Sequence, residues 1–166
     1  TDCDTGRAEY LTEKSGDRQR LLDICRASSS LPYVSQIINV DGQPYLDGGI
    51  VDSIPVERSI AMGHEHNVLI LTRNRGYRNT SKDRKIPKFI YKNYPRLRVD
   101  LSRRIAEYNR QLELVEQMED RGEVTVIRPL RPMEVDRIEK DEKKLEALYE
   151  EGFQLGEEFC KLKVVN

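Results

Sequence analysis

The chain has 166 residues, of which 37% are apolar and 34% are charged. This length suits one globular domain with a core, and no run approaches the roughly 20 apolar residues that a membrane span requires. Positive and negative charges nearly cancel, leaving a formal net charge of -1. Overall charge therefore indicates no particular partner.

The cysteines and the start of the chain give two further expectations. Cys3, Cys25 and Cys160 lie far apart, with no CxxC pair and no histidine at zinc-ligand spacing. We expect reduced thiols in a cytoplasmic setting, and neither a metal nor a cofactor. Because the chain begins at Thr1 without a methionine and runs straight into a turn, we expect it to be a piece of a longer protein.

The first elements follow a turn at Asp4-Thr5-Gly6. Weak alternation over 8–13 predicts a short strand. The next segment, 17–26, predicts a helix of about three turns with Asp17 as its N-cap. One side of this helix carries Leu21, Leu22 and Cys25.

A hairpin and a short helix are predicted next. Residues 35–40 read as a strand, and Asp41-Gly42 is a turn that leads to Asp47. Ser53 is a suitable cap for the following helix, with Pro55 in its first turn and Gly63 just past its end. The hairpin therefore presents Asp47 at the end of its second arm.

Two later segments predict sheet strands. Residues 67–72 form a continuous apolar run, which is typical of a strand buried on both faces, usually in a parallel sheet with helices on each side. Residues 123–128 read as a second such strand that ends at Pro129. With helices before and between these strands, the pattern predicts an α/β fold.

Two long helices complete the prediction. The first is packed on the sheet through an apolar stripe at steps of four and three, namely Leu101, Ile105, Tyr108, Leu112 and Val115. The last helix covers about 142–162, and Gly152 and Gly156 permit close approach of another backbone. Its predicted inward side consists of Leu145, Leu148, Gly152, Leu155 and Phe159.

Asp47-Gly48-Gly49 is the strongest candidate for chemistry. Glycines lack a Cβ, so the backbone can adopt positive φ, a substrate can come near, and backbone N–H groups can hold a carboxylate. This suits a general base, although a bare Asp-Gly-Gly is more often only a turn. A calcium-binding EF-hand loop is excluded, because its sixth and twelfth positions need Gly and Glu where this chain has Leu46 and Asp52.

Two other groups of residues invite functional interpretations. His64 and His66 follow a helix end, and we interpret them as part of a solvated turn. The segment 73–98 holds one acid, Asp83, and interleaved aromatic residues. Its basic residues are Arg73, Arg75, Arg78, Lys82, Arg84, Lys85, Lys88, Lys92, Arg96 and Arg98. A solvated surface neutralised by the acidic stretch 134–158 is favoured, and binding to phosphates or a membrane surface is the alternative.

Several motifs in this order resemble the second half of the bacterial patatin-like phospholipases, and the likeness runs over nearly the whole chain. The most specific part is a block of small residues followed, at this separation, by the Asp-Gly-Gly motif. The motifs are Thr5-Gly6-x-Ala8-Glu9-Tyr10, Ala27-Ser28-Ser29-Ser30-Leu31-Pro32, Asp41-Gly42-Gln43-Pro44-Tyr45-Leu46-Asp47-Gly48-Gly49, Asp52-Ser53-Ile54-Pro55-Val56, Leu71-Thr72-Arg73-x-x-Gly76-Tyr77-Arg78 and Val126-Ile127-Arg128-Pro129.

The resemblance implies a fold and a mechanism. It implies that 1–166 is one domain, the C-terminal portion of a three-layer α/β/α sandwich, with about 130–166 as a C-terminal helical extension. It also implies lipid acyl hydrolysis through a Ser–Asp dyad in which Asp47 is the catalytic base and Gly48 and Gly49 shape its loop. The family's nucleophile sits in a G-x-S-x-G elbow and its oxyanion hole in an earlier glycine-rich loop, and this chain contains neither.

These observations define the expected function. The full-length parent is expected to be a serine-dependent carboxylic ester hydrolase, and this chain alone to be inactive because it supplies the Asp without the Ser. The expected partners are a lipid or other acyl-ester substrate, a transient contact with a membrane surface and a second copy paired through an open sheet edge. No nucleic acid partner is expected. A phosphate- or membrane-surface-binding module using 73–98 is the alternative function.

Overall fold

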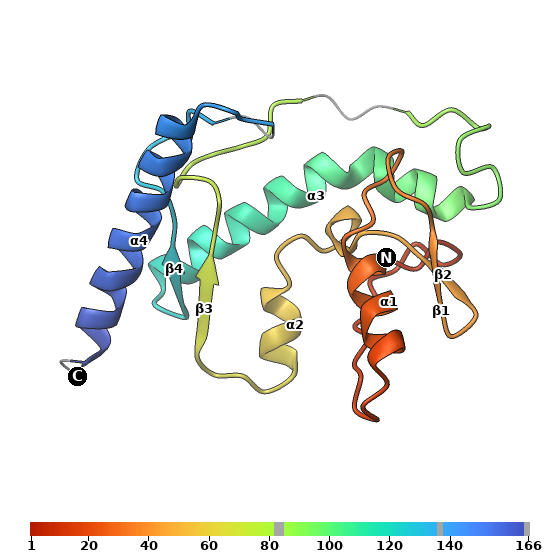
Figure 1. The fold of residues 1–166 in the computed structure, drawn as a ribbon, viewed down its shortest axis with the longest axis horizontal. Coiled ribbons are helices and arrows are strands. Elements are labelled where there is room, and N and C mark those ends of the chain that lie inside the picture. The colour runs from red at the N-terminus through yellow and green to blue at the C-terminus, as the bar shows by residue number, and fades with distance from the viewer. Residues whose placement is uncertain (82–84, 136–137, 165–166) are drawn as a thin grey trace. The chain divides into compact units, whose positions relative to one another are not determined.

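The computed structural model describes residues 1–81, 85–135 and 138–164 and has a mixed α/β fold (Figure 1). Two strands pair in an antiparallel hairpin, and two others pair in parallel. In chain order, the elements are α1 (Arg18–Ser28), β1 (Ile38–Val40), β2 (Gln43–Tyr45), the 3₁₀ turn η1 (Gly48–Ile50), α2 (Val56–Ala61), β3 (Asn67–Ile70), α3 (Pro95–Asp120), β4 (Val124–Ile127) and α4 (Glu142–Val164).

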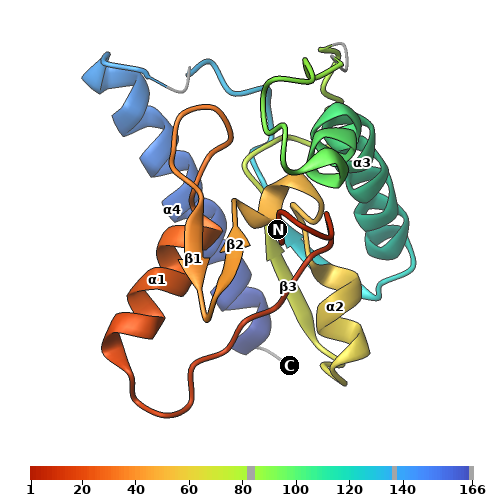
Figure 2. The ribbon, with the colours of Figure 1, turned by 90° about the vertical axis from the view of Figure 1, so that its right-hand side faces the viewer.

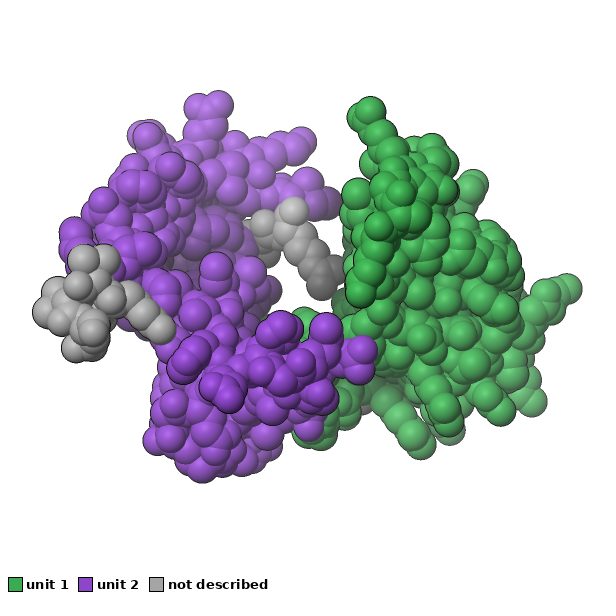
Figure 3. Space-filling model, turned by 90° about the horizontal axis from the view of Figure 1, so that it is seen from below, with its two compact units in different colours: residues 1–55, 79–111 green, residues 56–78, 112–166 purple. Residues whose placement is uncertain are grey.

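The chain divides into two compact units, which Figure 3 shows in different colours. Unit 1 consists of 1–55 and 79–111, and unit 2 consists of 56–78 and 112–166. The boundary falls within α3, so that the first part of this helix belongs to unit 1 and its last part, from Leu112, belongs to unit 2.

The predicted hairpin is confirmed in unit 1. Asp41 and Gly42 both have positive φ, 53° and 84°, which is the backbone geometry of a type I′ turn between antiparallel strands. Residues 1–3 pair with the other edge of β2, where the Cys3 N–H donates to the Pro44 carbonyl at 2.9 Å. β2 is therefore held on both edges, and its end fixes where Leu46 and Asp47 begin.

Helix α1 begins as predicted, because Asp17 caps it by accepting a hydrogen bond from the Arg20 N–H at 3.0 Å. Its packed side differs from the predicted one. Ala27 is buried against Val40 and Tyr45, so that α1 lies beside the hairpin (Figure 2). Leu21 and Leu22, by contrast, are 48% and 44% exposed, and Cys25 is also exposed. Which side of α1 is buried depends on where the hairpin lies, and the sequence of the helix does not show this.

The strand predicted over 8–13 is absent from the structure. Arg20 binds the end of this segment, since its guanidinium donates to the Thr12 carbonyl at 2.8 Å and to the Glu13 carboxylate at 2.9 Å. Hydrogen bonds from Ser15 and then from Arg20 lower the pKa of Glu13 to about 2. Side-chain contacts have replaced the expected strand pairing.

The core of unit 1 joins α3 to the residues around Asp47. Leu46 and Ile50 are buried with Leu97 and Leu101 of α3, and Cys3 lies in the same cluster. Burial raises the pKa of the Cys3 thiol to about 11. Leu101 of the predicted apolar stripe is buried as predicted, but it packs against Leu46 and Ile50 instead of against a strand.

A second contact between α3 and the N-terminal segment requires a glycine. A Cβ on Gly6, whose φ is +71°, would lie 2.1 Å from Oδ2 of Asp100. The Asp100 carboxylate therefore lies directly against the glycine backbone, and burial raises its pKa. The glycine of the motif Thr5-Gly6 serves this close approach.

Unit 2 contains the predicted parallel pairing of β3 with β4. Leu69 and Val124 are buried, as are Val115 and two of its neighbours on α3, Leu112 and Met118. The prediction that β3 is buried on both faces is wrong for this structure, because Ile70 is 78% exposed. The sheet therefore has one covered face and one open face.

Helices α2 and α4 differ in part from the prediction. Gly63, with φ of +87°, follows the end of α2 as predicted, but the Ser53 hydroxyl donates to the Gly49 carbonyl instead of capping α2. In α4, Leu145 is 44% exposed, and a Cβ on Gly152 would meet nothing within 4 Å. The same holds for Gly156, so neither glycine serves a close helix contact.

The environments of the three thiols predict different reactivities. Cys25 and Cys160 are exposed, whereas Cys3 is fully buried with a raised pKa. We expect two thiols of the native chain to react rapidly with an aromatic disulfide reagent near pH 8, and the third to react only after denaturation. A Cys25→Ser, Cys160→Ser double variant should show no rapid phase. Three rapid thiols in the wild-type chain would contradict this packing.

Candidate functional site

Asp47 lies between β2 and η1 and is partly exposed. One carboxylate oxygen, Oδ1, accepts a hydrogen bond from the Gly49 N–H at 2.6 Å. The Asp47 N–H donates to the Ser30 carbonyl at 3.0 Å, which fixes the backbone from the other side. Among the described residues, Oδ2 has no hydrogen-bond partner. The carboxylate is therefore oriented through one oxygen and can accept a proton through the other.

The two glycines after Asp47 have different roles. A Cβ on Gly49 would lie 3.0 Å from Oδ1 of Asp47 and 3.5 Å from Oγ of Ser53, whereas a Cβ on Gly48 would meet nothing within 4 Å. Positive φ, which the sequence allowed at these positions, occurs at six other glycines and at neither of these two. A methyl group on Gly49 would therefore crowd the Asp47 carboxylate by a few tenths of an ångström, whereas one on Gly48 would not.

Helix α3 supports this loop through two polar side chains. Nε of Arg104 donates to the Gly49 carbonyl at 3.0 Å. Gln111 is 4% exposed, and its Oε1 accepts from the N–H groups of Ser53 and Ile54 at 3.0 Å and 3.1 Å. Residues seven apart lie on one face of a helix, so both side chains reach the loop.

Arg104 and Gln111 are not among the site residues that the sequence pattern indicated. Arg104 directly precedes Ile105 in the apolar stripe of α3, and Gln111 directly precedes Leu112. A polar residue that recurs after seven positions beside such a stripe is the available signal, but it does not indicate which loop the residue contacts.

Asp52 is a second carboxylate close in sequence, but its environment differs. Its Oδ1 accepts from Nε2 of Gln111 at 2.8 Å, and its Oδ2 accepts from the Tyr10 hydroxyl. Both oxygens are therefore engaged in holding the loop, whereas one oxygen of Asp47 is not. Asp47 therefore remains the candidate base, whereas Asp52 holds the loop through both of its oxygens.

The serines near this loop are turned toward backbone carbonyls. Oγ of Ser30 donates to the Arg26 carbonyl at 2.7 Å, and Oγ of Ser29 donates to the Cys25 carbonyl at 2.9 Å. Within residues 1–81, 85–135 and 138–164, no serine hydroxyl is hydrogen-bonded to Asp47. In the part of the chain that the structure describes, the candidate base therefore has no serine hydroxyl paired with its carboxylate.

The first part of the basic segment is neutralised within unit 2. Arg75 pairs with Glu119 and Asp120, and Arg78 pairs with Glu116 at 2.7 Å. The hydrogen bond from Arg78 is the main reason why the pKa of Glu116 is lowered. These acids belong to α3, so the prediction that 134–158 would neutralise these arginines is wrong.

The rest of the basic segment belongs to unit 1. Lys82, Asp83 and Arg84 lie outside the described residues. Lys85, Lys88, Lys92 and Arg96 are exposed, and none of them forms an ion pair with a described acid. Positive charge in this part of the surface is therefore not cancelled by neighbouring described side chains.

The other candidate sites are less suited to chemistry than the loop at Asp47. His64 and His66 are exposed just after the turn that follows α2, and no group of three or more potential ligands in the described residues could hold a metal ion. No helix in the described part of the chain is both long and apolar enough to cross a bilayer.

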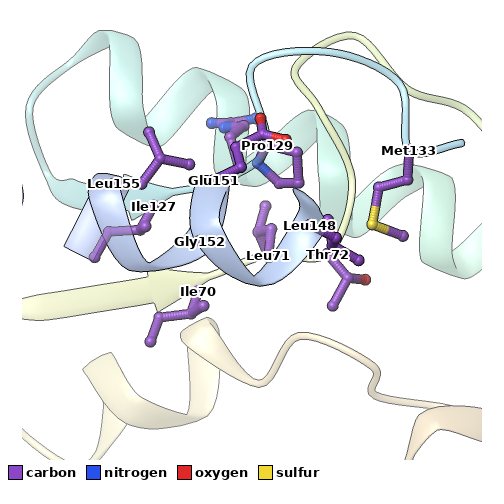
Figure 4. A pocket seen from close by; sticks show the side chains of 11 residues that line it. Ile70, Leu71, Thr72, Ile127, Pro129, Met133, Leu148, Glu151, Gly152 and Leu155 are labelled. Atoms are coloured by element: carbon purple, nitrogen blue, oxygen red, sulfur yellow. The ribbon is translucent and has the colours of Figure 1, made fainter. Parts of the chain in front are cut away.

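Unit 2 contains an apolar cavity of about 220 Å³ between β3, β4 and α4 (Figure 4). The guanidinium of Arg128 at this cavity pairs with Glu116 and Glu119. The cavity is lined by Ile70, Leu71, Thr72, Ile127, Arg128, Pro129, Met133, Leu148, Glu151, Gly152 and Leu155. These residues provide no carboxylate–nucleophile pair, so the loop at Asp47 is the better candidate.

Two separate segments of the chain match different protein families. The family model for patatin-like phospholipases matches residues 3–60, which confirms the resemblance over that segment. A second family model, a domain of unknown function (DUF6363), matches residues 94–162. The uncharacterized protein YjjU of Escherichia coli (strain K12) is 41% identical over 56 residues, which cover 33% of this chain and 16% of that protein. No solved structure matches.

The two matched segments meet in unit 1. Asp47 and Gly49 belong to the first segment, and Arg104 and Gln111 belong to the second. The hydrogen bonds of Arg104 and Gln111 therefore connect the segment of unknown function to the loop that carries the candidate base.

The contacts of Gln111 predict a local loss of stability when its amide is removed. Gln111→Leu preserves the approximate volume but leaves the N–H groups of Ser53 and Ile54 without their acceptor. We expect the free energy of unfolding to fall by about 1–3 kcal/mol, measured by urea denaturation. The control Gln117→Leu lies at an exposed position of α3 and should change it by less than about 0.5 kcal/mol. Equal effects of both substitutions would show that the buried amide has no special role.

Proposed function

We propose that the match of residues 3–60 to the patatin-like phospholipases reflects activity, and that the full-length parent is a lipid acyl hydrolase with Asp47 as its general base. One observation carries this proposal. Within the matched segment, Asp47 is oriented by the Gly49 N–H through Oδ1, while Oδ2 has no partner among the described residues. A general base needs this combination of fixed position and available lone pair.

The proposed reaction uses Asp47 twice. As a serine Oγ attacks the ester carbonyl, Oδ2 of Asp47 takes its proton, and the tetrahedral intermediate collapses when the departing alcohol takes the proton from Asp47. This leaves an acyl-serine. Asp47 then takes a proton from a water molecule that attacks the acyl carbonyl, and the serine leaves with that proton as the fatty acid is released. Asp52 keeps the loop in place throughout.

The serine and the oxyanion donors are proposed to belong to a part of the parent outside this chain. No G-x-S-x-G sequence occurs between Thr1 and Asn166, and the local serines donate to backbone carbonyls. An oxyanion hole usually contributes a large share of the rate acceleration in acyl transfer. The chain by itself therefore lacks two of the three parts that the reaction requires.

We also propose that the parent completes a three-layer α/β/α sandwich. The parallel pair of β3 and β4 supports this, since parallel strands are usually covered on both faces. The exposure of Ile70 agrees with a face that further parts of the parent would cover.

The chain alone is expected to be inactive. Purified residues 1–166 should hydrolyse a short-chain p-nitrophenyl ester at no more than the background rate, because the nucleophile is absent. The rate should be unchanged in Asp47→Ala. Robust hydrolysis that is lost in Asp47→Ala would contradict the assignment of the nucleophile to another part of the parent.

In the full-length parent, Asp47→Asn should lower kcat by at least about 100-fold, because general base catalysis typically contributes 100- to 10,000-fold. Gly49→Ala should lower kcat by about tenfold with little change in KM, since a small displacement of a catalytic group is costly.

The matched control is Gly48→Ala, which has open space for its methyl group and should retain wild-type kcat. If Asp47→Asn keeps full activity while the protein stays folded, Asp47 is not the base.

A further inference from the structure

Two loops of unit 1 expose large apolar side chains. The loop after α1 contains Tyr33 and Val34, which are 56% and 83% exposed. The segment before α3 contains Phe89, which is 79% exposed. Val34 and Phe89 are among the most exposed large apolar side chains in the described part of the chain, and such residues matter when they gather in one surface.

These loops are tied to each other and to the site. The Tyr33 N–H donates to the Tyr91 hydroxyl at 2.8 Å, and the two rings lie 5.9 Å apart between centroids. Both tyrosines have positive φ, 71° and 50°, an uncommon conformation for aromatic residues. The Ser30 carbonyl just before the first loop accepts from the Asp47 N–H at 3.0 Å. The contacts therefore link both loops to the backbone of Asp47.

The second loop adds positive charge to this apolar surface. Lys85, Lys88 and Lys92 lie on both sides of Phe89 in the sequence and are exposed. No described acid pairs with them, in contrast to Arg75 and Arg78. Exposed lysines next to aromatic and aliphatic side chains are the combination that binds at the headgroup level of an anionic bilayer.

We propose that residues 31–34 and 85–92 form an interfacial face that docks on an anionic lipid surface. Val34 and Phe89 enter the boundary between headgroups and acyl chains, and the three lysines contact lipid phosphates. The inference rests on the proposed function, because it names how such a hydrolase reaches an ester in a bilayer. The hydrogen bond between Ser30 and Asp47 then connects the docked loop to the base.

Charge distinguishes this partner from a second copy of the chain. A symmetric pairing through the interfacial face would bring the same lysines of two copies together, whereas anionic lipid offers them opposite charge. Aliphatic Leu31 and Val34 also favour lipid over single-stranded nucleic acid, which is bound mainly by aromatic stacking and charge.

The test is co-sedimentation of the purified chain with vesicles. Binding is compared between phosphatidylcholine vesicles and vesicles with equal parts of phosphatidylcholine and phosphatidylglycerol, at low and high salt. We expect binding to the anionic vesicles that weakens with salt and little binding to phosphatidylcholine alone. Asp47→Asn should bind as the wild type does, because docking does not require catalysis.

Two variants locate the binding surface. The double variant Val34→Ser, Phe89→Ser and the triple variant Lys85→Gln, Lys88→Gln, Lys92→Gln should each weaken binding by at least about tenfold. All five substituted residues are exposed, so folding should be retained, and circular dichroism checks this. The controls are Leu130→Ser, at a residue 77% exposed in unit 2, and the triple variant Lys140→Gln, Lys143→Gln, Lys161→Gln. Both controls should bind as the wild type does.

Several results would overturn the inference. These are no binding to anionic vesicles, an equal loss of binding in the controls, or a concentration-dependent dimer abolished by Val34→Ser, Phe89→Ser. Hydrolysis in the full-length parent is a separate readout. Vesicle binding without any acyl hydrolysis would refute the proposed function alone, and hydrolysis of a soluble ester without vesicle binding would refute the interfacial face alone.

Discussion

The buried amide of Gln111 is the contact on which the site geometry depends most. The first turn of the loop from Asp47 to Ile54 is closed by its own hydrogen bonds, but the N–H groups of Ser53 and Ile54 have Gln111 as their acceptor. Gln111 accepts from two backbone N–H groups of this loop and donates to Asp52, while Arg104 holds the Gly49 carbonyl. A buried amide with these partners satisfied fixes the loop, because any other loop conformation would leave polar groups unpaired.

This arrangement gives the segment of unknown function a structural role. Residues 94–162 match a family without an assigned function, yet α3 within it contributes Leu97 and Leu101 to the core beneath Leu46 and Ile50. The same helix face provides Arg104 and Gln111 to the loop above that core. Within unit 1, residues 3–55 and the first part of α3 therefore pack together around Asp47. The segment 94–162 thus contributes directly to the loop that carries the candidate base.

Tertiary contacts divide the basic segment 73–98 into a part whose charge is neutralised and a part whose charge is not. In sequence, 73–98 is one patch of positive charge. In the structure, Arg75 and Arg78 are neutralised by acids of α3, whereas Lys85, Lys88 and Lys92 are exposed without a described acidic partner. Of these two groups, the second keeps its positive charge available to an anionic partner, and its lysines flank the exposed Phe89 in the sequence. The proposed interfacial face therefore uses a shorter part of this segment, 85–92, together with the loop 31–34, which the sequence pattern did not indicate.

The sequence by itself determined the features that depend on local chemistry. Residue-specific backbone preferences and short-range hydrogen bonds account for the Asp17 cap, the turn at Asp41-Gly42, Gly63 just past the end of α2 and the position of Asp47 after a hairpin. Only the tertiary structure decided which faces are covered and which polar groups meet. The exposed Leu21 and Ile70, the missing strand at 8–13 and the partners of Arg104 and Gln111 depend on segments distant in the chain. Periodicity shows that a helix or strand has an apolar side, but the neighbour that covers it is set by packing.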